Sequence, residues 1–493
     1  MRAGIRIILF VAALLEASVL QGQNAKELTF SIDDVTSIAV GNANQAVQAK
    51  HILESEQFSF DSFIASRRWQ LGLNVNPSYQ LMSLSPEAYS VSGFSDYNAL
   101  SAGATLDFSK LIEGTGGYAY ASSNFAWSDF FSDYYSQSFG SRNMFGTTPL
   151  RVGYRQELIG YNGSLWEKLI RETQMENARK EYVAELAEIS EQAAGYFFSY
   201  ATCKAMYDMY KVNAESADSL YKIGQKKYEL TSIRKDELLS LQLQLMNSQN
   251  DVRSSFNNME KARRSLLSFL NMGYDDVSVE VVLPENPGHV IIVEPGQAVE
   301  MAKKYNPEFG KARAASLTAE QELDKARREK GLHVDLDLSV GLQKYGYDLK
   351  TLGTTNSPFT VANVTFSFPI VDHGMRRNNY NSAKSRLEYY TVQEVEQERI
   401  ITEAIVNTVN ELMIHQQMLS DTKTAMELAD ESFKQNQYNY AHGLSDINTF
   451  TLSQNRKDSA HINYISSLSD FWLAYYRLCS LTLYDFYNMK PLE

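Results

Sequence analysis

The second half of this chain repeats its first half at a fixed offset of 212 positions. Within a window of about fifteen residues, six recur at that offset, against about one expected from ordinary composition. A two-fold repeat spread over long helical stretches implies a structural body that is built twice. The pattern favours an assembled tube or scaffold over a single catalytic cleft. The recurring residues are Glu215, Ala217, Asp218, Lys222, Gln225 and Tyr228, which return as Glu427, Ala429, Asp430, Lys434, Gln437 and Tyr440.

The N-terminus has the composition of a secretory signal peptide, predicted over residues 1–23. Two arginines precede the apolar stretch Ile7–Leu15, and small and polar residues follow, with a cleavage site near Gly22. Glu16 interrupts the apolar stretch well short of the roughly 20 residues that span a bilayer, which argues against a membrane anchor. No later run of 18 apolar residues occurs, so the mature chain is expected to contain no transmembrane helix.

Alternating apolar and polar residues predict β-strands in both halves of the chain. Residues 332–343 alternate without a break, and similar patterns run through residues 69–75 and 100–108. A soluble β-sandwich would produce the same pattern, so alternation alone leaves both a sandwich and a membrane barrel open. Further strands are expected over about 117–131, 148–157 and 359–369, the last with a bulge near Val361–Ala362.

Two features favour a membrane barrel over a sandwich. Strands of about ten residues with polar alternate positions suit a wall that has a wet lumen and a lipid-facing outside. Aromatic residues also crowd the strand ends and loops, as they do where lipid headgroups meet hydrocarbon. These aromatic residues are Tyr118, Tyr120, Phe125, Trp127, Phe130, Phe131, Tyr134 and Tyr135.

Long helical stretches separate the groups of strands. From about Gly163 to Tyr228 the sequence contains no proline, and a helix of that length would span roughly 100 Å. Its counterpart in the second half runs from about Met375 to Tyr440. Such helices are expected to pack along partners as a coiled coil. Shorter helices are expected over about 33–67, 235–271, 296–329 and 446–487.

These elements predict two structural repeats after the signal peptide. The first, residues 24–290, comprises a helix, strands over about 69–157 and long helices over about 163–271, with a linker over 273–296. The second, residues 291–493, comprises a helix, strands over about 332–369 and long helices over about 375–487.

The first repeat is longer than the second in its strand region. The difference is about 50 residues, with residues 82–147 corresponding to residues 344–358. We expect the extra region, about 99–147, to add a hairpin, which would give six strands per chain and a wider barrel. An aromatic extracellular loop folded over the mouth is the alternative.

Nothing in the sequence predicts catalysis, a cofactor or a metal site. The net charge of −13 argues against nucleic acid as a partner, since nucleic-acid binders carry basic patches. The seven histidines show no metal-ligand spacing among themselves or with the two cysteines. Asp372-His373-Gly374 lies at a predicted strand-to-helix junction, where a structural turn is favoured over an acid–base pair. The chain is therefore expected not to be an enzyme.

Four segments carry a resemblance to a known family. Phe368–Arg377 is similar to a strand-to-helix junction of that family, and Gln156–Leu165 is its counterpart 212 positions earlier. Ala302–Pro307 opens the second short helix, and Tyr440–Asp446 lies at a helical turn. In order, spacing and duplication, these segments resemble the TolC-like outer-membrane efflux proteins. The resemblance implies an α+β membrane protein, whose trimeric transmembrane β-barrel is continued by a long periplasmic α-helical barrel.

The resemblance also implies a function and partners. A homotrimer in the outer membrane of a Gram-negative bacterium, with a large periplasmic part, would form the exit duct of a tripartite efflux pump. It would take small molecules, such as drugs or metals, from an inner-membrane transporter and a periplasmic adaptor protein. The same channel serving type I protein secretion, and an exported coiled-coil scaffold without a pore, are the alternatives. The sequence does not identify the cargo or the class of pump.

The predicted site residues form three groups. In many family members two aspartates narrow the periplasmic mouth, but the matching positions here hold Thr449 and Leu452. Asp236 or Asp446 would then supply an acidic ring, although both equally suit helix starts, where carboxylates are favoured. The predicted adaptor-contact residues at the tip are Leu230, Thr231, Gly443, Leu444 and Ser445, and the predicted lumen residues are Asp107, Asp335, Asp337 and Ser339.

Overall fold

The computed structural model describes residues 26–86, 94–131, 140–273, 277–284, 292–354, 356–442 and 444–492. The predicted signal peptide lies outside the described residues. The chain divides into two compact units. We call Leu53–Arg179 with Pro307–Arg399 the sheet unit, and Met1–Ile52 with Lys180–Asn306 and Ile400–Glu493 the helical unit.

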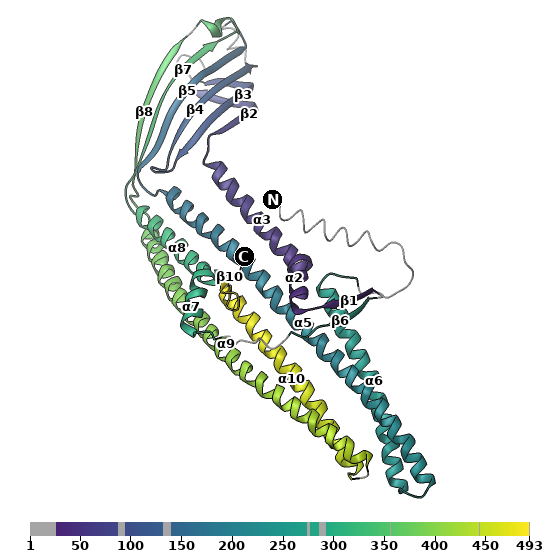
Figure 1. The fold of residues 1–493 in the computed structure, drawn as a ribbon. Coiled ribbons are helices and arrows are strands. Elements are labelled where there is room, and N and C mark those ends of the chain that lie inside the picture. Colours follow the sequence, from purple (N-terminus) through teal and green to yellow (C-terminus); the bar gives the residue numbers. More distant parts are fainter. Residues whose placement is uncertain are drawn as a thin grey trace. The chain divides into compact units, whose positions relative to one another are not determined.

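The sheet unit is built on one six-stranded antiparallel sheet with the strand order β2-β3-β4-β5-β7-β8 (Figure 1). Over the described residues, strands β2 and β8 are the two edges of this sheet, and each pairs with a strand on one side only. The strands are β2 (Gln70–Pro86), β3 (Phe94–Ile112), β4 (Gly117–Phe130), β5 (Asn143–Ile159), β7 (His333–Gly346) and β8 (Ser357–Ser367), with a 3-10 turn, η1 (Thr351–Gly353), between β7 and β8.

The extra region of the first repeat forms strands of this sheet. β3 and β4 pair with each other from Ala99↔Phe130 to Ile112↔Gly117, and each also pairs with a strand on its other side. The predicted hairpin is therefore confirmed over the described residues. The predicted bulge near Val361–Ala362 is wrong, because β8 pairs with β7 without any shift of register. The alternation changes there because two apolar residues of β8, Phe359 and Val361, lie on the polar face of the sheet, opposite Gly341 and Ser339.

A buried arginine holds the base of the sheet unit together. Arg67 follows helix α3 (Asn44–Ser66) and donates to the Oγ and carbonyl oxygen of Ser164, at the start of α5 (Gly163–Glu229). Glu113, in the β3–β4 turn, and Glu167 lie 3.9 and 3.6 Å from its guanidinium nitrogens. Because a buried charge is stable only when it is paired, Arg67 fixes the β3–β4 turn against the ends of two helices. The unit also contains α8 (Pro307–Arg328) and the first part of α9 (Met375–Ala441).

The helical unit contains two long helical hairpins and a small parallel β-bridge. The bridge pairs β1 (Lys26–Phe30) with β6 (Val277–Val281), and the Tyr200 hydroxyl of α5 donates to the carbonyl oxygen of Val279 at 2.6 Å. No helix in the described part of the chain is long and apolar enough to cross a membrane. The remaining elements are α2 (Ile32–Asn42), α6 (Lys235–Phe269), α7 (Pro295–Tyr305), α10 (Ile447–Thr482), β9 (Tyr484–Asp485) and β10 (Lys490–Pro491).

The long helices follow the offset found in the sequence. Both ends of α9 lie 212 positions after the corresponding ends of α5, since 375 − 163 and 441 − 229 both equal 212. α10 likewise begins 212 positions after α6, since 447 − 235 equals 212. Near the two hairpin turns, Leu220, Leu241 and Phe450 form one buried apolar cluster. The two hairpins are therefore packed against each other by side chains close to their turns.

Candidate functional site

One face of the six-stranded sheet is apolar and exposed. A single row of register partners crosses all six strands on this face as Leu71, Phe108, Ala121, Val152, Val340 and Thr360. Soluble monomers rarely expose a continuous apolar patch of more than a few hundred Å². This face therefore requires an apolar environment. Its large residues, each more than a third exposed, include Leu71, Leu73, Val75, Leu106, Phe108, Leu150, Val152, Leu338, Val340, Val364 and Phe366.

The height of the apolar face fits a lipid bilayer. Trp69, directly before β2, and Tyr79 bound the apolar positions of that strand and are both exposed. Ten residues of strand span about 33 Å, which at a tilt of about 40° gives roughly the 25 Å height of a membrane barrel's apolar band. Trp69 stacks on Phe108 at 4.5 Å, while Tyr79 meets Phe131 at 6.2 Å. Aromatic side chains therefore mark both ends of the band.

The predicted aromatic girdle is only partly on the apolar face. Phe125 and Trp127 lie there, opposite Ala104 and Ala102 of β3. Tyr118 and Tyr120 instead share the polar face, opposite Arg155 and Gly153 of β5. Of the remaining girdle residues, Tyr134 and Tyr135 lie outside the described residues.

The opposite face of the sheet is polar, and all four predicted lumen residues lie on it. Asn74 donates to Asp107 at 3.1 Å, and Arg155 forms an ion pair with Asp337 at 3.1 Å. Arg151 donates to the Ser339 hydroxyl at 3.2 Å, and the carboxylate of Asp335 is exposed on the same side. These contacts hold the polar side chains in place, so that the polar face can be in contact with water.

The structure adds two positive charges to this polar face. Arg151 and Arg155 occupy alternate positions of β5 among the acidic side chains. The residues predicted from the sequence to line this face were acidic or carried a hydroxyl group. The signal that could have found the arginines was their period-two position within the strand predicted over residues 148–157. The face is therefore of mixed charge and not uniformly acidic.

A tyrosine ties three strands together on the polar face. The Tyr120 hydroxyl of β4 donates to Asp337 of β7 at 3.2 Å, reaching across β5. The ring passes over Gly153 of β5, where an added Cβ would lie 2.3 Å from a ring carbon. Glycine is therefore required at position 153 so that the ring can cross the strand.

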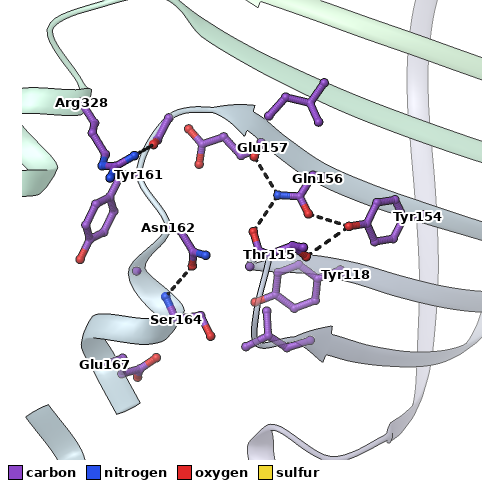
Figure 2. A pocket seen from close by; sticks show the side chains of 15 residues that line it. Thr115, Tyr118, Tyr154, Gln156, Glu157, Tyr161, Asn162, Ser164, Glu167 and Arg328 are labelled. Atoms are coloured by element: carbon purple, nitrogen blue, oxygen red, sulfur yellow. Dashed lines mark hydrogen bonds between the residues drawn. The ribbon is translucent and has the colours of Figure 1, made fainter. Parts of the chain in front are cut away.

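A cavity of about 790 Å³ lies where the sheet meets the start of α5 (Figure 2). The Gln156 side chain donates to the carbonyl oxygens of Thr115 and Glu157 at 2.7 and 2.8 Å and accepts from the Tyr154 hydroxyl at 2.6 Å. Asn162 accepts from the backbone N–H of Ser164 at 3.1 Å. These contacts fix the turn from strand to helix, and burial raises the pKa of the Tyr161 phenol on the cavity wall.

The second strand-to-helix junction is a capped turn. The Asp372 carboxylate accepts from the backbone N–H groups of Gly374 and Arg376 at 2.9 and 3.3 Å, and these bonds lower the pKa of Asp372. His373 and Gly374 both have positive φ, at 49° and 85°. The segment therefore starts α9, which agrees with a structural turn and not an acid–base pair.

Two leucines project from the hairpin turns of the helical unit. Leu230, between α5 and α6, is 74% exposed, and Leu444, between α9 and α10, is 75% exposed. Thr231 adopts a left-handed conformation with φ of 55°, and Ser445 is partly buried. Gly443, the fifth predicted contact residue, lies outside the described residues. The exposed leucines make each turn a small apolar contact point.

The four candidate aperture residues have different environments. Asp446 is the N-cap of α10, where its carboxylate accepts from the backbone N–H of Thr449 at 2.8 Å, and this bond lowers the pKa of Asp446. Asp236 lies in the first turn of α6, 3.5 Å from Arg234. Thr449 and Leu452 are exposed on α10. Both aspartates thus occupy positions that favour carboxylates for structural reasons alone.

Residues 298–481 match a family model described as outer membrane efflux protein. This chain carries an outer membrane efflux protein domain. The predicted resemblance to TolC-like proteins is thereby confirmed, as is the location in the outer membrane. The match to a family of efflux proteins also identifies the protein as a transport component and not an enzyme.

Solved structures with the same fold are outer-membrane proteins of low sequence identity. VceC of Vibrio cholerae matches with a TM-score of 0.63 and 14% identity, covering 92% of this chain and 96% of its own. The CmeC channel of Campylobacter jejuni matches with a TM-score of 0.65 and 12% identity, covering 92% and 85%. CusC matches with a TM-score of 0.64 and 11% identity, covering 94% and 95%. None of the curated proteins matched the sequence of this chain. The fold is therefore that of TolC-like channels.

Replacing Gly153 by valine is expected to destabilise the six-stranded sheet. The added methyl groups would displace the Tyr120 ring and break its hydrogen bond to Asp337, and overpacking of this kind costs about 1–3 kcal/mol. Gly72→Val is the matched control, since nothing lies within 4 Å of a Cβ at that position. Heat-induced loss of β-structure in detergent should occur at a lower temperature only for Gly153→Val. Equal melting temperatures for the two variants would contradict the role of Gly153.

Substitutions of Asp446 can distinguish its role as the N-cap of α10 from a role of its negative charge. An asparagine side chain at this position would still accept from the backbone N–H of Thr449. Asp446→Asn should therefore leave the α9–α10 turn as protease-resistant as the wild type, while Asp446→Ala should loosen it. Because the pKa of Asp446 is lowered in the folded state, the cap contributes at neutral pH and is lost as acid protonates the carboxylate. Equal protease sensitivity of the two variants would show that the cap is not what Asp446 supplies.

Proposed function

We propose that three copies of this chain form an outer-membrane exit duct of a tripartite efflux pump. The sheets of the three copies would close into one barrel in the membrane, and their helices would form a periplasmic tube. The tube would receive small molecules from an inner-membrane transporter through a periplasmic adaptor. The observation that carries the proposal is a single sheet with an exposed apolar face and a hydrogen-bonded polar face.

The free edges of the sheet support assembly from several copies. A strand edge inside a bilayer leaves backbone N–H and C=O groups without hydrogen-bond partners, so only closed sheets span membranes. Since β2 and β8 are the two edges of a six-stranded antiparallel sheet, they run in opposite directions. The β8 edge of one copy can therefore pair antiparallel with the β2 edge of the next. Head-to-tail contacts of this kind close into a ring.

Exposed apolar residues on the helices support the same assembly. Leu239, Leu243 and Met246 of α6 are each more than half exposed and recur at intervals of four and three residues. Such spacing is that of a seam between helices. A second seam lies in the sheet unit, where Tyr389, Val392 and Val395 of α9 are more than 60% exposed. Neighbouring copies would cover both seams, and the shared 212-residue offset of the helices supports two structural repeats in each chain.

The non-pore alternative finds no support in the sheet. In a β-sandwich the apolar face of one sheet is covered by a second sheet. Over the described residues, all the long strands belong to one sheet, and its apolar residues are exposed. A channel for protein secretion would share this architecture, so the partner transporter decides between secretion and efflux.

The proposed pore is tested by inserting the purified protein into planar lipid bilayers. The protein should require detergent to stay dissolved, because its apolar sheet face is exposed, and it should produce discrete steps of ionic conductance. Heat-denatured protein in the same detergent is the control. A protein that stays soluble without detergent, or gives no more conductance than the denatured control, would contradict the proposal.

The turn residues test the adaptor contact. Leu444→Glu should abolish efflux of a pump substrate from cells while leaving the amount of assembled trimer unchanged, because a charge replaces an exposed apolar contact. The same effect is expected when Gly443 is replaced by a bulky charged residue. Leu230→Glu is the matched variant at the other turn, with nearly equal exposure. Val212→Glu, at a residue of α5 that is 60% exposed, is a control away from the turns. Normal efflux in both turn variants would show that the exposed leucines of the turns do not form the adaptor contact.

A further inference from the structure

The connection between short and long helices is twice as long in the first repeat as in the second. Between the end of α3 at Ser66 and the start of α5 at Gly163 lie 96 residues, because 163 − 66 − 1 equals 96. Between the end of α8 at Arg328 and the start of α9 at Met375 lie 46, because 375 − 328 − 1 equals 46. The first repeat therefore holds an insertion of 50 residues.

The insertion can be assigned to two strands. β2 and β7 each follow a short helix, and β5 and β8 each lead into a long helix. This leaves β3 and β4, which have no counterpart in the second repeat. Together, the hairpin and its flanking connections account for the extra length. We call Phe94–Phe130 the inserted hairpin.

The inserted hairpin is part of the sheet on both of its faces. On the polar face, Asn124 donates to Thr105 at 2.8 Å within the hairpin, and Asn74 of β2 donates to Asp107 of β3. On the same face, but at the opposite edge of the hairpin, the Tyr120 hydroxyl donates to Asp337 of β7. On the apolar face, Leu106 and Phe108 are exposed in the same rows as residues of β2. A loop folded over the mouth of the barrel would have neither these polar contacts nor these apolar register partners.

We propose that the inserted hairpin widens the membrane barrel of this protein to eighteen strands. The proposal rests on the proposed trimer, since three copies of six strands give 3 × 6 = 18. Without the hairpin, four strands per copy would give 3 × 4 = 12. An even number of antiparallel strands closes in either case.

The widening changes which part of the duct limits the size of cargo. With strands about 4.8 Å apart and tilted by about 40°, eighteen strands give a backbone diameter of roughly 35 Å, against roughly 24 Å for twelve. Barrels of sixteen to eighteen strands leave an open aqueous channel. The outer-membrane opening therefore admits bulky, hydrated cargo, and selection by size falls to another part of the pump.

Polymer exclusion in planar bilayers tests this proposal. Neutral polymers of graded size, added on the barrel side, lower the conductance only if they enter the barrel. The full chain should admit polymers at least about 1.5-fold larger in radius than the largest admitted by a variant lacking Phe94–Phe130, as the ratio of the two diameters requires. The deletion joins the end of β2 to the start of β5, which lie at the same end of the sheet. The same size limit for both proteins would overturn the inserted hairpin's role while leaving the proposed channel intact.

A second measurement uses the full chain and does not depend on the deletion variant folding. Phe125 and Asn124 are neighbours on β4, on the apolar and polar faces respectively. In a background without Cys203 and Cys479, a fluorophore on Phe125→Cys should be quenched by brominated lipid, and one on Asn124→Cys by aqueous iodide. Quenching of both positions by iodide alone would place the hairpin outside the wall and overturn the proposal. Loss of all conductance in the full chain would instead contradict the proposed function.

Discussion

Backbone hydrogen bonding at the two edges of the sheet is the constraint on which this structure depends. Among the described residues, every inner strand of the six is paired on both sides, while β2 and β8 are each paired with a strand on one side only. Water can satisfy the peptide groups on the other side of such a strand, but hydrocarbon cannot. Because the same sheet carries an exposed apolar face, its surroundings are apolar where its edges are open. Pairing of each edge with the edge of another copy would give the peptide groups of both edge strands their hydrogen-bond partners.

The polar face follows from the same geometry. Side chains alternate between the two faces of a strand, so an apolar outer face leaves every second residue on the inner side. On this chain those residues form cross-strand contacts, such as Arg155 with Asp337 and Asn124 with Thr105. The contacts satisfy side chains that would otherwise destabilise the wall. They also give the polar face both positive and negative side chains. A face of this kind is readily hydrated and does not favour solutes of one charge only.

Much of the fold could be predicted from the sequence because its signals are local or periodic. The long helices were predicted to begin at Gly163 and Met375, and both begin there. Unbroken alternation predicted the strand over residues 332–343, which corresponds closely to β7. The 212-residue offset of the sequence reappears in the helix bounds. These features depend on the residues themselves and on their spacing, which a single sequence contains.

The rest could not be predicted, because it depends on contacts between distant segments. The ion pair of Arg155 with Asp337 joins residues 182 positions apart, and no local pattern pairs them. The hydrogen bond from Tyr120 across Gly153 depends on the register of three strands. On β8, two apolar residues on the polar face, Phe359 and Val361, led to the wrong prediction of a bulge. The sequence also left open whether Asp446 lines an aperture, whereas the structure shows its carboxylate capping a helix.

Disulfide cross-linking between the two edge strands tests the central claim most directly. Asn74→Cys on β2 would be combined in turn with Val361→Cys, Asn363→Cys or Thr365→Cys on β8, in a chain lacking its native cysteines. Three copies that share a closed sheet should yield, on oxidation, a covalent ring of three chains for one of these combinations. Asn74→Cys with Ser339→Cys, on the inner strand β7, should yield none. Oxidised protein that runs only as single chains in every combination would show that β2 and β8 do not meet between copies.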